Sequence, residues 1–228
     1  QSLPYSAFPS GIRFDVLHYM NPRIWPSYLL TPAGKIAFTA FEAGVMLNLH
    51  KPSSADYAFR ITNRYLHQRM AKVIACSEYG RQEIMKAFHL PGDRVAAIQL
   101  GVDTRFRPVE ITPENKQKLE KFGFKQPYIL SVGRLDPHKN IHRLIESFGL
   151  IQKNFPSVQL ALVGGRHLAE YAQKVDAAIA ALPSPEAVFF APFIPDEDLP
   201  LVYSAAELFA YPSIHEGFGL PIIESMAS

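Results

Sequence analysis

The sequence predicts an α/β protein with parallel sheets that helices cover on both faces. Short runs that are apolar throughout alternate with stretches of helical periodicity, which is typical of buried parallel strands. Hydrophobic residues make up 48% of the 228-residue chain and charged residues 19%, so the chain can bury a real core. A length of about 100–200 residues per domain leaves room for two such units.

The second half of the chain shows this alternation most clearly. Residues 128–132 form a β-rich run that ends at Gly133, and apolar residues then recur at helical spacing over 141–151. Strands and helices continue in alternation at 158–163, 168–182, 187–191, 196–206 and 208–211, and Pro221 suits the first position of a further helix. This pattern indicates a doubly wound unit, in which ligands bind beyond the carboxyl ends of the strands.

The first half carries weaker signals of the same kind. Strands are expected at 14–19, 36–41, 72–76 and 95–100, and a helix at Ile84, Met85 and Phe88. Two prolines and many charges between 103 and 126 indicate a linker with a short helix. We therefore expect an N-terminal domain over 1–106, a linker over 107–126 and a C-terminal domain over 127–228. Both domains are expected to be incomplete, because the chain lacks an initial Met and ends just inside a helix.

Composition excludes several classes of protein. The net charge of +2, without a dense stripe of Lys and Arg, argues against a nucleic-acid partner. Cys76 is the single cysteine, so no intrachain disulfide is expected, and a reducing, cytoplasmic location fits. We expect Cys76 to be a small buried hydrophobe at a strand end. No run approaches the roughly 20 apolar residues that cross a bilayer.

Familiar catalytic and metal-binding motifs are missing from the sequence. It contains neither G-x-x-x-x-G-K-[ST], nor G-x-G-x-x-G, nor H-E-x-x-H. His138 and His142 are four residues apart, but a solvated helix start explains them better than a metal pair. The acidic triplet 196–198 imitates a metal-binding D-x-D, yet it directly precedes a helix, where carboxylates cap free N–H groups. No metal site is expected.

Residues 133–140 form the first candidate ligand-binding loop. The loop follows a buried strand and precedes an amphipathic helix, so Arg134 and Lys139 project at the ligand-binding edge. Asn140 is the expected N-cap of that helix. Two cations beside a helix N-terminus suit a diphosphate, although on this segment alone two solvated loop cations explain the pattern equally well.

Residues 211–221 form the second candidate loop. Gly217 and Gly219 would let backbone N–H groups approach a ligand closely. Glu216 lies in the loop, and Glu224 lies about one turn into the following helix. Both carboxylates are suited to accept hydrogen bonds from sugar or ribose hydroxyls, and helix capping is the competing explanation for either of them.

Both loops resemble a known family. The string E-G-F-G-L-P-I-I-E from Glu216 to Glu224, preceded by Y-P-S, resembles the E-x7-E signature of retaining glycosyltransferases of family four. Residues 131–140, S-V-G-R-L-D-P-H-K-N, are similar to that family's diphosphate-binding strand, turn and helix. Gly101, Val102 and Asp103, with Phe106 and Pro108, resemble the end of its N-terminal domain, and the stretch 75–78 resembles the strand-to-helix turn a little upstream. The likeness covers about 70–228 well and the first 70 residues loosely, and it implies a GT-B fold of two Rossmann-like domains.

The resemblance also implies roles for individual residues. Arg134 and Lys139 would bind the donor diphosphate, Glu216 would contact the transferred sugar, and Glu224 would hold the nucleotide ribose. Arg134, Lys139 and Glu216 are thereby the expected catalytic residues. Further donor contacts are implied for Gly133, Gly217, Phe218, Gly219 and Leu220.

The implied reaction transfers a sugar from a UDP- or GDP-type nucleoside-diphosphate sugar to a hydroxyl acceptor. Configuration is retained, without metal or cofactor, and the leaving phosphate oxygen itself deprotonates the acceptor. Glycan, lipid-linked and other hydroxyl acceptors fit, in polysaccharide, glycolipid or glycan biosynthesis, and so does peripheral membrane association.

The first domain departs from the family pattern. Relatives carry T-x-H-D where this chain has T-A-F-E at 39–42, so no acceptor-side histidine is assigned, and Glu42, His18 and His50 are only loose candidates. Two other functions stay open at this point. One is a sugar-nucleotide epimerase of the same fold, and the other is a non-catalytic nucleotide-sugar binding module.

Overall fold

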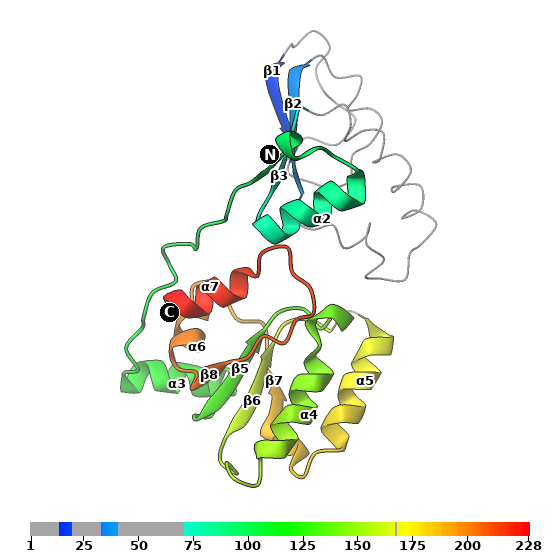
Figure 1. Ribbon diagram of the computed structural model, residues 1–228. Coiled ribbons are helices and arrows are strands. Elements are labelled where there is room, and N and C mark those ends of the chain that lie inside the picture. Colours follow the sequence, from blue (N-terminus) through cyan, green and yellow to red (C-terminus); the bar gives the residue numbers. More distant parts are fainter. Residues whose placement is uncertain (1–13, 20–32, 41–70, 167) are drawn as a thin grey trace. The chain divides into compact units, whose positions relative to one another are not determined.

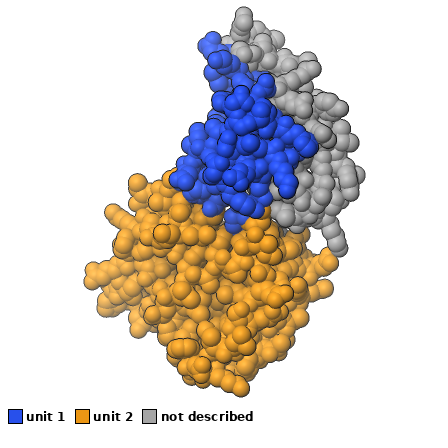
Figure 2. Space-filling view, viewed as in Figure 1, with its two compact units in different colours: residues 1–100, 216–218 blue, residues 101–215, 219–228 orange. Residues whose placement is uncertain are grey.

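The computed structural model describes residues 14–19, 33–40, 71–166 and 168–228, whose helices and strands are drawn in Figure 1. The chain divides into two compact units, coloured separately in Figure 2. The first unit comprises residues 1–100 and 216–218, and the second comprises 101–215 and 219–228. Each unit has its own parallel sheet and its own hydrophobic core.

The first unit contains a four-stranded parallel sheet in the order β1-β2-β3-β4. Its elements are β1 (Phe14–Tyr19), β2 (Ala33–Ala40), β3 (Lys72–Ala75), α2 (Glu78–Phe88), the 3-10 turn η2 (Gly92–Arg94) and β4 (Val95–Ala97). Ile84 and Phe88 of α2 pack on Phe38 and Val73 of the sheet. Cys76 is buried after β3, as predicted.

One strand of this unit begins earlier than predicted and another ends earlier, because pairing with the neighbouring strand sets where each of them begins or ends. β2 begins before Ile36 because its ladder with β1 starts where Phe14 pairs with Ala33. β4 ends at Ala97 because its partner β3 ends at Ala75, where the chain turns into α2. Ser77 is the N-cap of that helix, and its hydroxyl accepts from the N–H of Gly80 at 2.9 Å.

The second unit contains a four-stranded parallel sheet in the order β7-β6-β5-β8. Its helices are α3 (Pro113–Lys121), α4 (Ile141–Ile151), α5 (Ala169–Ala180), α6 (Leu199–Ser204) and α7 (Leu220–Ala227). Its strands are β5 (Tyr128–Val132), β6 (Gln159–Val163), β7 (Val188–Phe190) and β8 (Leu208–Phe209), and its 3-10 turns are η3 (Pro137–Lys139) and η4 (Pro185–Ala187).

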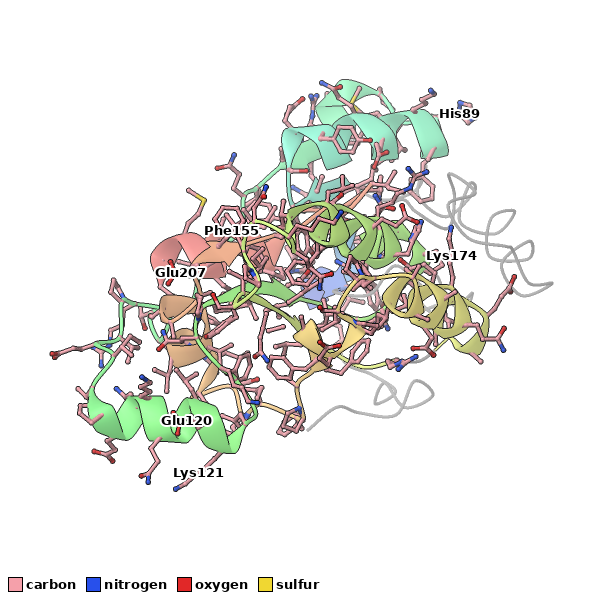
Figure 3. The ribbon with its side chains drawn as sticks, turned by 90° about the horizontal axis from the view of Figure 1, so that it is seen from below. His89, Glu120, Lys121, Phe155, Lys174 and Glu207 are labelled. Carbon is pink, nitrogen blue, oxygen red and sulfur yellow. The ribbon has the colours of Figure 1, made fainter. Side chains whose placement is uncertain are left out.

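Side chains of the central strands alternate between the two faces of this sheet. Tyr128 and Leu130 pack with α6 and with Leu119 of α3, the helix expected in the linker. Ile129 packs with α4 and α5 on the other face. Polar side chains turn outward, as Lys121 and Lys174 show in Figure 3. The predicted double covering of a parallel sheet is confirmed.

The acidic triplet before α6 does not act as predicted. Asp198 is the N-cap residue, but its side chain makes no capping hydrogen bond, and the helix begins only at Leu199. Its backbone lies in the helical region rather than the extended region that aims a capping side chain. The buried carboxylate instead pairs with Lys118 of α3, and Asp196 lies 3.5 Å from Arg105. The capping prediction is therefore wrong.

The strand order places a topological switch point at β5. From β5 the chain passes through α4 to β6 and through α5 to β7, and then returns through α6 to β8 on the other side of β5. In open parallel sheets ligands bind at the carboxyl ends of the two strands where the direction of winding reverses. Here those ends lead into the loops 133–140 and 210–219.

Candidate ligand-binding site

The structure brings the loop after β5 together with the first part of the loop after β8. The carbonyl of His138 accepts from the N–H of Ile214 at 2.8 Å and from the hydroxyl of Ser213 at 3.1 Å. Lys139 Nζ donates to Tyr211 Oη at 2.5 Å and lies 4.8 Å from the centre of the tyrosine ring. Tyr211 was not predicted as a site residue, although it stands in the Y-P-S string.

The loops after β5 and β6 meet backbone to backbone. The N–H of Gly133 donates to Val163 at 2.8 Å, and the N–H of Leu135 donates to Gly165 at 3.0 Å. Gly164 has φ 145°, and a Cβ built there would lie 2.0 Å from the carbonyl oxygen of Gly133. Only glycine fits such an approach. This contact fixes Gly133, a predicted donor-binding residue, at the rim of the sheet.

Arg134 is held by a residue that sequence reasoning missed. Its Nη2 lies 2.9 Å from Oδ2 of Asp136, a buried carboxylate in the same loop. The side chain of Arg134 is nevertheless 69% exposed. A guanidinium has five N–H donors, so one carboxylate orients it and leaves donors for an anion. In the sequence, the string R-L-D indicated this ion pair, because it places a carboxylate two residues after the cation.

The start of α4 differs from the prediction. Asn140 occupies the N-cap position in the left-handed region, φ 59° and ψ 29°, and its side chain makes no capping hydrogen bond. The hydroxyl of Tyr171, from α5, takes that place: it accepts weakly from the N–H of His142 at 3.5 Å and lies 3.1 Å from His142 Nδ1. Asn140 is therefore the N-cap residue, as predicted, but its side chain does not cap the helix.

His142 is buried rather than part of a solvated helix start, because its face of α4 packs on α5. Burial lowers the pKa of His142, and the charges of Lys174 and Arg143 add to that effect against the opposing charge of Glu146. The neutral ring can accept the Tyr171 proton while the tyrosine oxygen accepts from the backbone. Tyr171 thereby takes up an N–H group in the first turn of α4.

Glu224 lies inside α7 and not at its end. The helix follows Gly219, which has φ 86°, and Pro221 stands one position later in the helix than predicted. Glu224 Oε2 accepts from the hydroxyl of Tyr203 at 2.9 Å, so the capping explanation for Glu224 is wrong. Burial, followed by the charge of Glu224, raises the pKa of Tyr203, which keeps the phenol protonated as a donor. Sequence reasoning missed Tyr203.

The middle of the second loop belongs to the first unit. Residues 216–218 belong there by their contacts, and all three are partly exposed. Within that unit the hydroxyl of Ser77 donates to the carbonyl of Gly217 at 2.9 Å. Leu220, the first residue of α7, is exposed in the second unit.

Of the loose acceptor-side candidates, the structure describes only His18. Its Nε2 lies 2.8 Å from Oγ1 of the buried Thr39, and the histidine itself is exposed on β1. Glu42 and His50 lie outside the described residues. The structure therefore places one imidazole beside Thr39 without assigning it a role.

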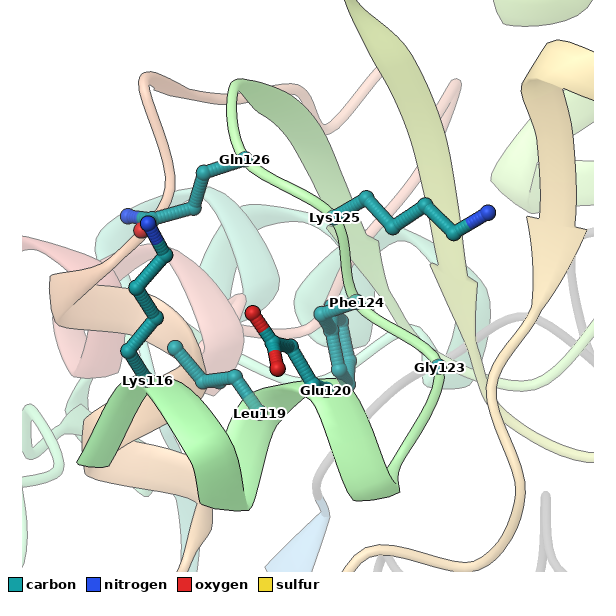
Figure 4. Close-up of a pocket in the computed structure, with 7 residues that line it drawn as sticks. All are labelled: Lys116, Leu119, Glu120, Gly123, Phe124, Lys125 and Gln126. Atoms are coloured by element: carbon teal, nitrogen blue, oxygen red, sulfur yellow. The ribbon is translucent and has the colours of Figure 1, made fainter. Parts of the chain in front are cut away.

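A surface hollow of about 470 Å³ lies beside α3, away from these loops. Figure 4 shows its lining residues, which are Lys116, Leu119, Glu120, Gly123, Phe124, Lys125 and Gln126. The lining residues precede the first residue of β5 in the sequence, so the hollow borders the amino end of that strand. Ligands bind at the opposite edge in such sheets, and we assign this hollow no part in the site.

Two absences concern only the part of the chain that the structure describes. Within it, no three His, Cys, Asp or Glu side chains gather closely enough to hold a metal ion. Nor does any helix among these residues have the length and apolar character to span a membrane.

Two parallel-sheet units, one with cations and a carboxylate around its switch point, define an α/β protein of the GT-B type. The chain belongs to the glycosyl transferases group 1 family, whose sequence model matches residues 112–228. The model of Glycosyltransferase Family 4 matches residues 6–106. The resemblance seen in the two loops is thus confirmed at the level of the family, and the chain is of glycosyltransferase type.

Individual relatives agree with this assignment. The chain is 33% identical to the O-antigen chain mannosyltransferase B of Escherichia coli, over 74% of this chain and 45% of that protein. It is 31% identical to a GDP-mannose-dependent alpha-(1-6)-phosphatidylinositol monomannoside mannosyltransferase of Mycolicibacterium smegmatis, over 64% of this chain and 37% of that protein. The chain thus spans less than half the length of these two relatives.

Among solved structures, the fold is similar to that of an Anabaena protein crystallised with UDP-glucose. The TM-score is 0.68 at 22% identity, covering 85% of this chain and 51% of that one. At this identity the likeness supports the two-domain fold and does not indicate which ligand this chain binds.

Proposed function

We propose that this chain carries the donor site of a retaining glycosyltransferase that uses a nucleoside-diphosphate sugar. The observation that carries the proposal is the pairing of functional groups at the β5/β8 switch point. Lys139 follows β5 and is held by Tyr211 after β8, while Glu224 lies in the helix that the β8 loop enters. A cation and a carboxylate on the elements that flank this point suit a diphosphate and a ribose.

Negative charge that builds up on the departing diphosphate is the main source of the activation barrier that the site has to lower. Arg134 and Lys139 would neutralise it, and one such donor typically contributes roughly 3 kcal/mol to the transition state. With two cations in this role the reaction would proceed without a metal ion. Glu216 would contact the transferred sugar, and Gly133, Gly217, Phe218, Gly219 and Leu220 would line the donor. A leaving phosphate oxygen would take the acceptor proton, with retention at the anomeric carbon.

The relatives suggest which donor and acceptor to try first. Two of them carry mannosyltransferase names, and one name specifies GDP-mannose, so a GDP-mannose donor is our first choice and UDP-glucose the second. The same names specify an O-antigen chain and a phosphatidylinositol monomannoside. We propose a glycan or lipid-linked hydroxyl acceptor, a cytoplasmic location and peripheral association with a membrane.

A donor panel tests the proposal. GDP, UDP and ADP, each alone and as a sugar nucleotide, are titrated while the unfolding temperature is followed, since a ligand of the folded state raises it. The best donor is then supplied with glycan and lipid acceptors in EDTA, and the anomer of the product is assigned by NMR. No stabilisation by any nucleotide would refute the donor site. Loss of turnover in EDTA, or an inverted product, would refute the metal-free or the retaining mechanism.

Labelled donor without acceptor separates transfer from epimerisation. A transferase leaves the sugar of the intact donor unchanged, whereas an epimerase converts it. The match to a glycosyltransferase family favours the first outcome.

A further inference from the structure

Four aromatic rings of the second unit form a continuous series beside Glu224. Phe106 meets Tyr203 edge to face at 5.9 Å, Tyr203 meets Phe209 at 5.5 Å, and Phe209 stacks on Tyr211 at 5.8 Å and 21°. Each of the two tyrosines in this series holds a residue that we propose binds the sugar donor. Tyr203 donates to Glu224, and Tyr211 accepts from Lys139.

The ring of Tyr203 has little freedom to move. It is 5% exposed, in the core formed by α3, β5 and α6, and the rings of Phe106 and Phe209 pack against it. A buried phenol requires a hydrogen-bond partner, and here the partner is a carboxylate, which makes the bond charge-assisted. The fixed ring therefore selects one rotamer of the partly exposed Glu224.

We infer that Tyr203 is a positioning residue for Glu224, fixing the carboxylate that receives the ribose hydroxyls of the nucleotide. This inference rests on the proposed function, because it takes Glu224 as the ribose ligand. Tyr203 itself does not contact the donor. Without the hydrogen bond from Tyr203, Glu224 would lose rotamer freedom when the nucleotide binds, and that entropy cost would weaken the affinity. The bond restricts the side chain of Glu224 before the nucleotide binds.

Arg105 is a cation whose charge interacts with that of Glu224. Its guanidinium pairs with Asp103 at 2.9 Å and lies 3.5 Å from Asp196. The hydrogen bond to Asp103 is the main cause of its raised pKa, and the charges of Asp196 and Glu224 add to it. Glu224 thus has a neutral hydrogen-bond donor in Tyr203, and the exposed guanidinium of Arg105 adds an attractive charge.

The test compares ribose with 2′-deoxyribose nucleotides. Calorimetric affinities for GDP, UDP, dGDP and dUDP are measured for the unmutated protein, for Tyr203→Phe and for Glu224→Ala. Tyr128→Phe is the matched control, because Tyr128 is buried in the same core and its hydroxyl donates to the carbonyl of Val202 at 2.7 Å. Each Phe variant keeps its ring and loses one buried hydroxyl.

We expect Tyr203→Phe to weaken binding of the ribonucleotide by about threefold to tenfold, the value of one net hydrogen bond, with little effect on the deoxynucleotide. Its preference for ribose should fall toward that of Glu224→Ala, whereas Tyr128→Phe keeps the full preference. Equal weakening of both nucleotides, or an unchanged preference, overturns the inference and leaves the proposed function standing. Absence of binding to the unmutated protein, or a full ribose preference in Glu224→Ala, overturns both.

Discussion

Residues that bear on the proposed chemistry could be found in the sequence, but the tyrosines that hold two of them could not. Arg134, Lys139 and Glu224 stand in strings with a recognisable order and spacing. Two of their partners come from different elements, Tyr211 for Lys139 and Tyr203 for Glu224, whereas Asp136, the partner of Arg134, lies in the same loop. A tyrosine inside an apolar run is indistinguishable from any other core aromatic until the fold brings it to a charge.

Replacing either loop cation should abolish turnover without unfolding the protein. Arg134→Ala and Lys139→Ala each remove a charge that would stabilise the leaving diphosphate, so kcat should fall by about 100-fold or more. Arg143→Ala is the matched control, because its side chain is 69% exposed, as is that of Arg134, but it belongs to α4. Near-normal rates in either loop variant, with the expected circular dichroism, would remove that residue from the site.

Gly164 should tolerate no side chain. A methyl group there meets the carbonyl of Gly133, so Gly164→Ala forces two loops apart and should lower the free energy of unfolding by roughly 2–4 kcal/mol. Gly101→Ala is the control, since nothing lies within 4 Å of its Cβ position. Urea unfolding of both variants measures the difference, and equal stabilities would show that the close approach is dispensable.

At the scale of elements, alternation predicted which segments are strands and helices, and pairing decided where they end. β5 has the predicted bounds because it has partners on both sides. β8 is shorter than the predicted run 208–211, since only Leu208 and Phe209 find partners on β5. The first loop also contains a 3-10 turn, η3, which hydrophobic periodicity could not reveal because its residues are polar or proline.

The junction of α4 and α5 should make stability depend on pH. His142 has a pKa below its ordinary value of about 6.5 in the folded protein, so the unfolded chain binds more protons. Its contribution should therefore be present above about pH 6.5 and be lost progressively as the pH falls below that value. In His142→Asn the free energy of unfolding should fall less steeply between about pH 7 and 5.

The control for this experiment is His89→Asn. His89 is exposed after α2 and has φ 53°, a left-handed conformation that asparagine adopts readily. This variant should keep the slope of the unmutated protein. An unchanged slope in His142→Asn would mean that other groups cause the acid sensitivity.

On the scale of the whole molecule, the sequence indicated two α/β units, and the structure shows that each unit has hydrophobic core clusters of its own. The core of the first unit includes Ile84 of α2, and a core of the second includes Leu119 of α3. The family match agrees with the resemblance seen in the motifs. Residues that select the donor sugar and the acceptor do not follow from these motifs, because the motifs concern parts that all such donors share.

Separate cores should unfold separately. Leu119→Ala and Ile84→Ala each leave a cavity that typically costs about 2–5 kcal/mol. Hydrogen exchange read by mass spectrometry should show faster exchange in α3 and α6 for the first variant, and in α2 and β3 for the second. Faster exchange throughout the chain in either variant would mean that the two units form a single cooperative system.

The buried thiol at the end of β3 has a practical consequence for labelling. Cys76 is the single cysteine of the chain, it is 2% exposed, and burial raises its pKa, so the reactive thiolate is scarce in the folded protein. A cysteine introduced at an exposed position, such as Lys121 or Lys174, should therefore take a maleimide dye selectively while Cys76 stays in place. Fluorophores can then be attached to the native background, and their spectra recorded as nucleotides are added.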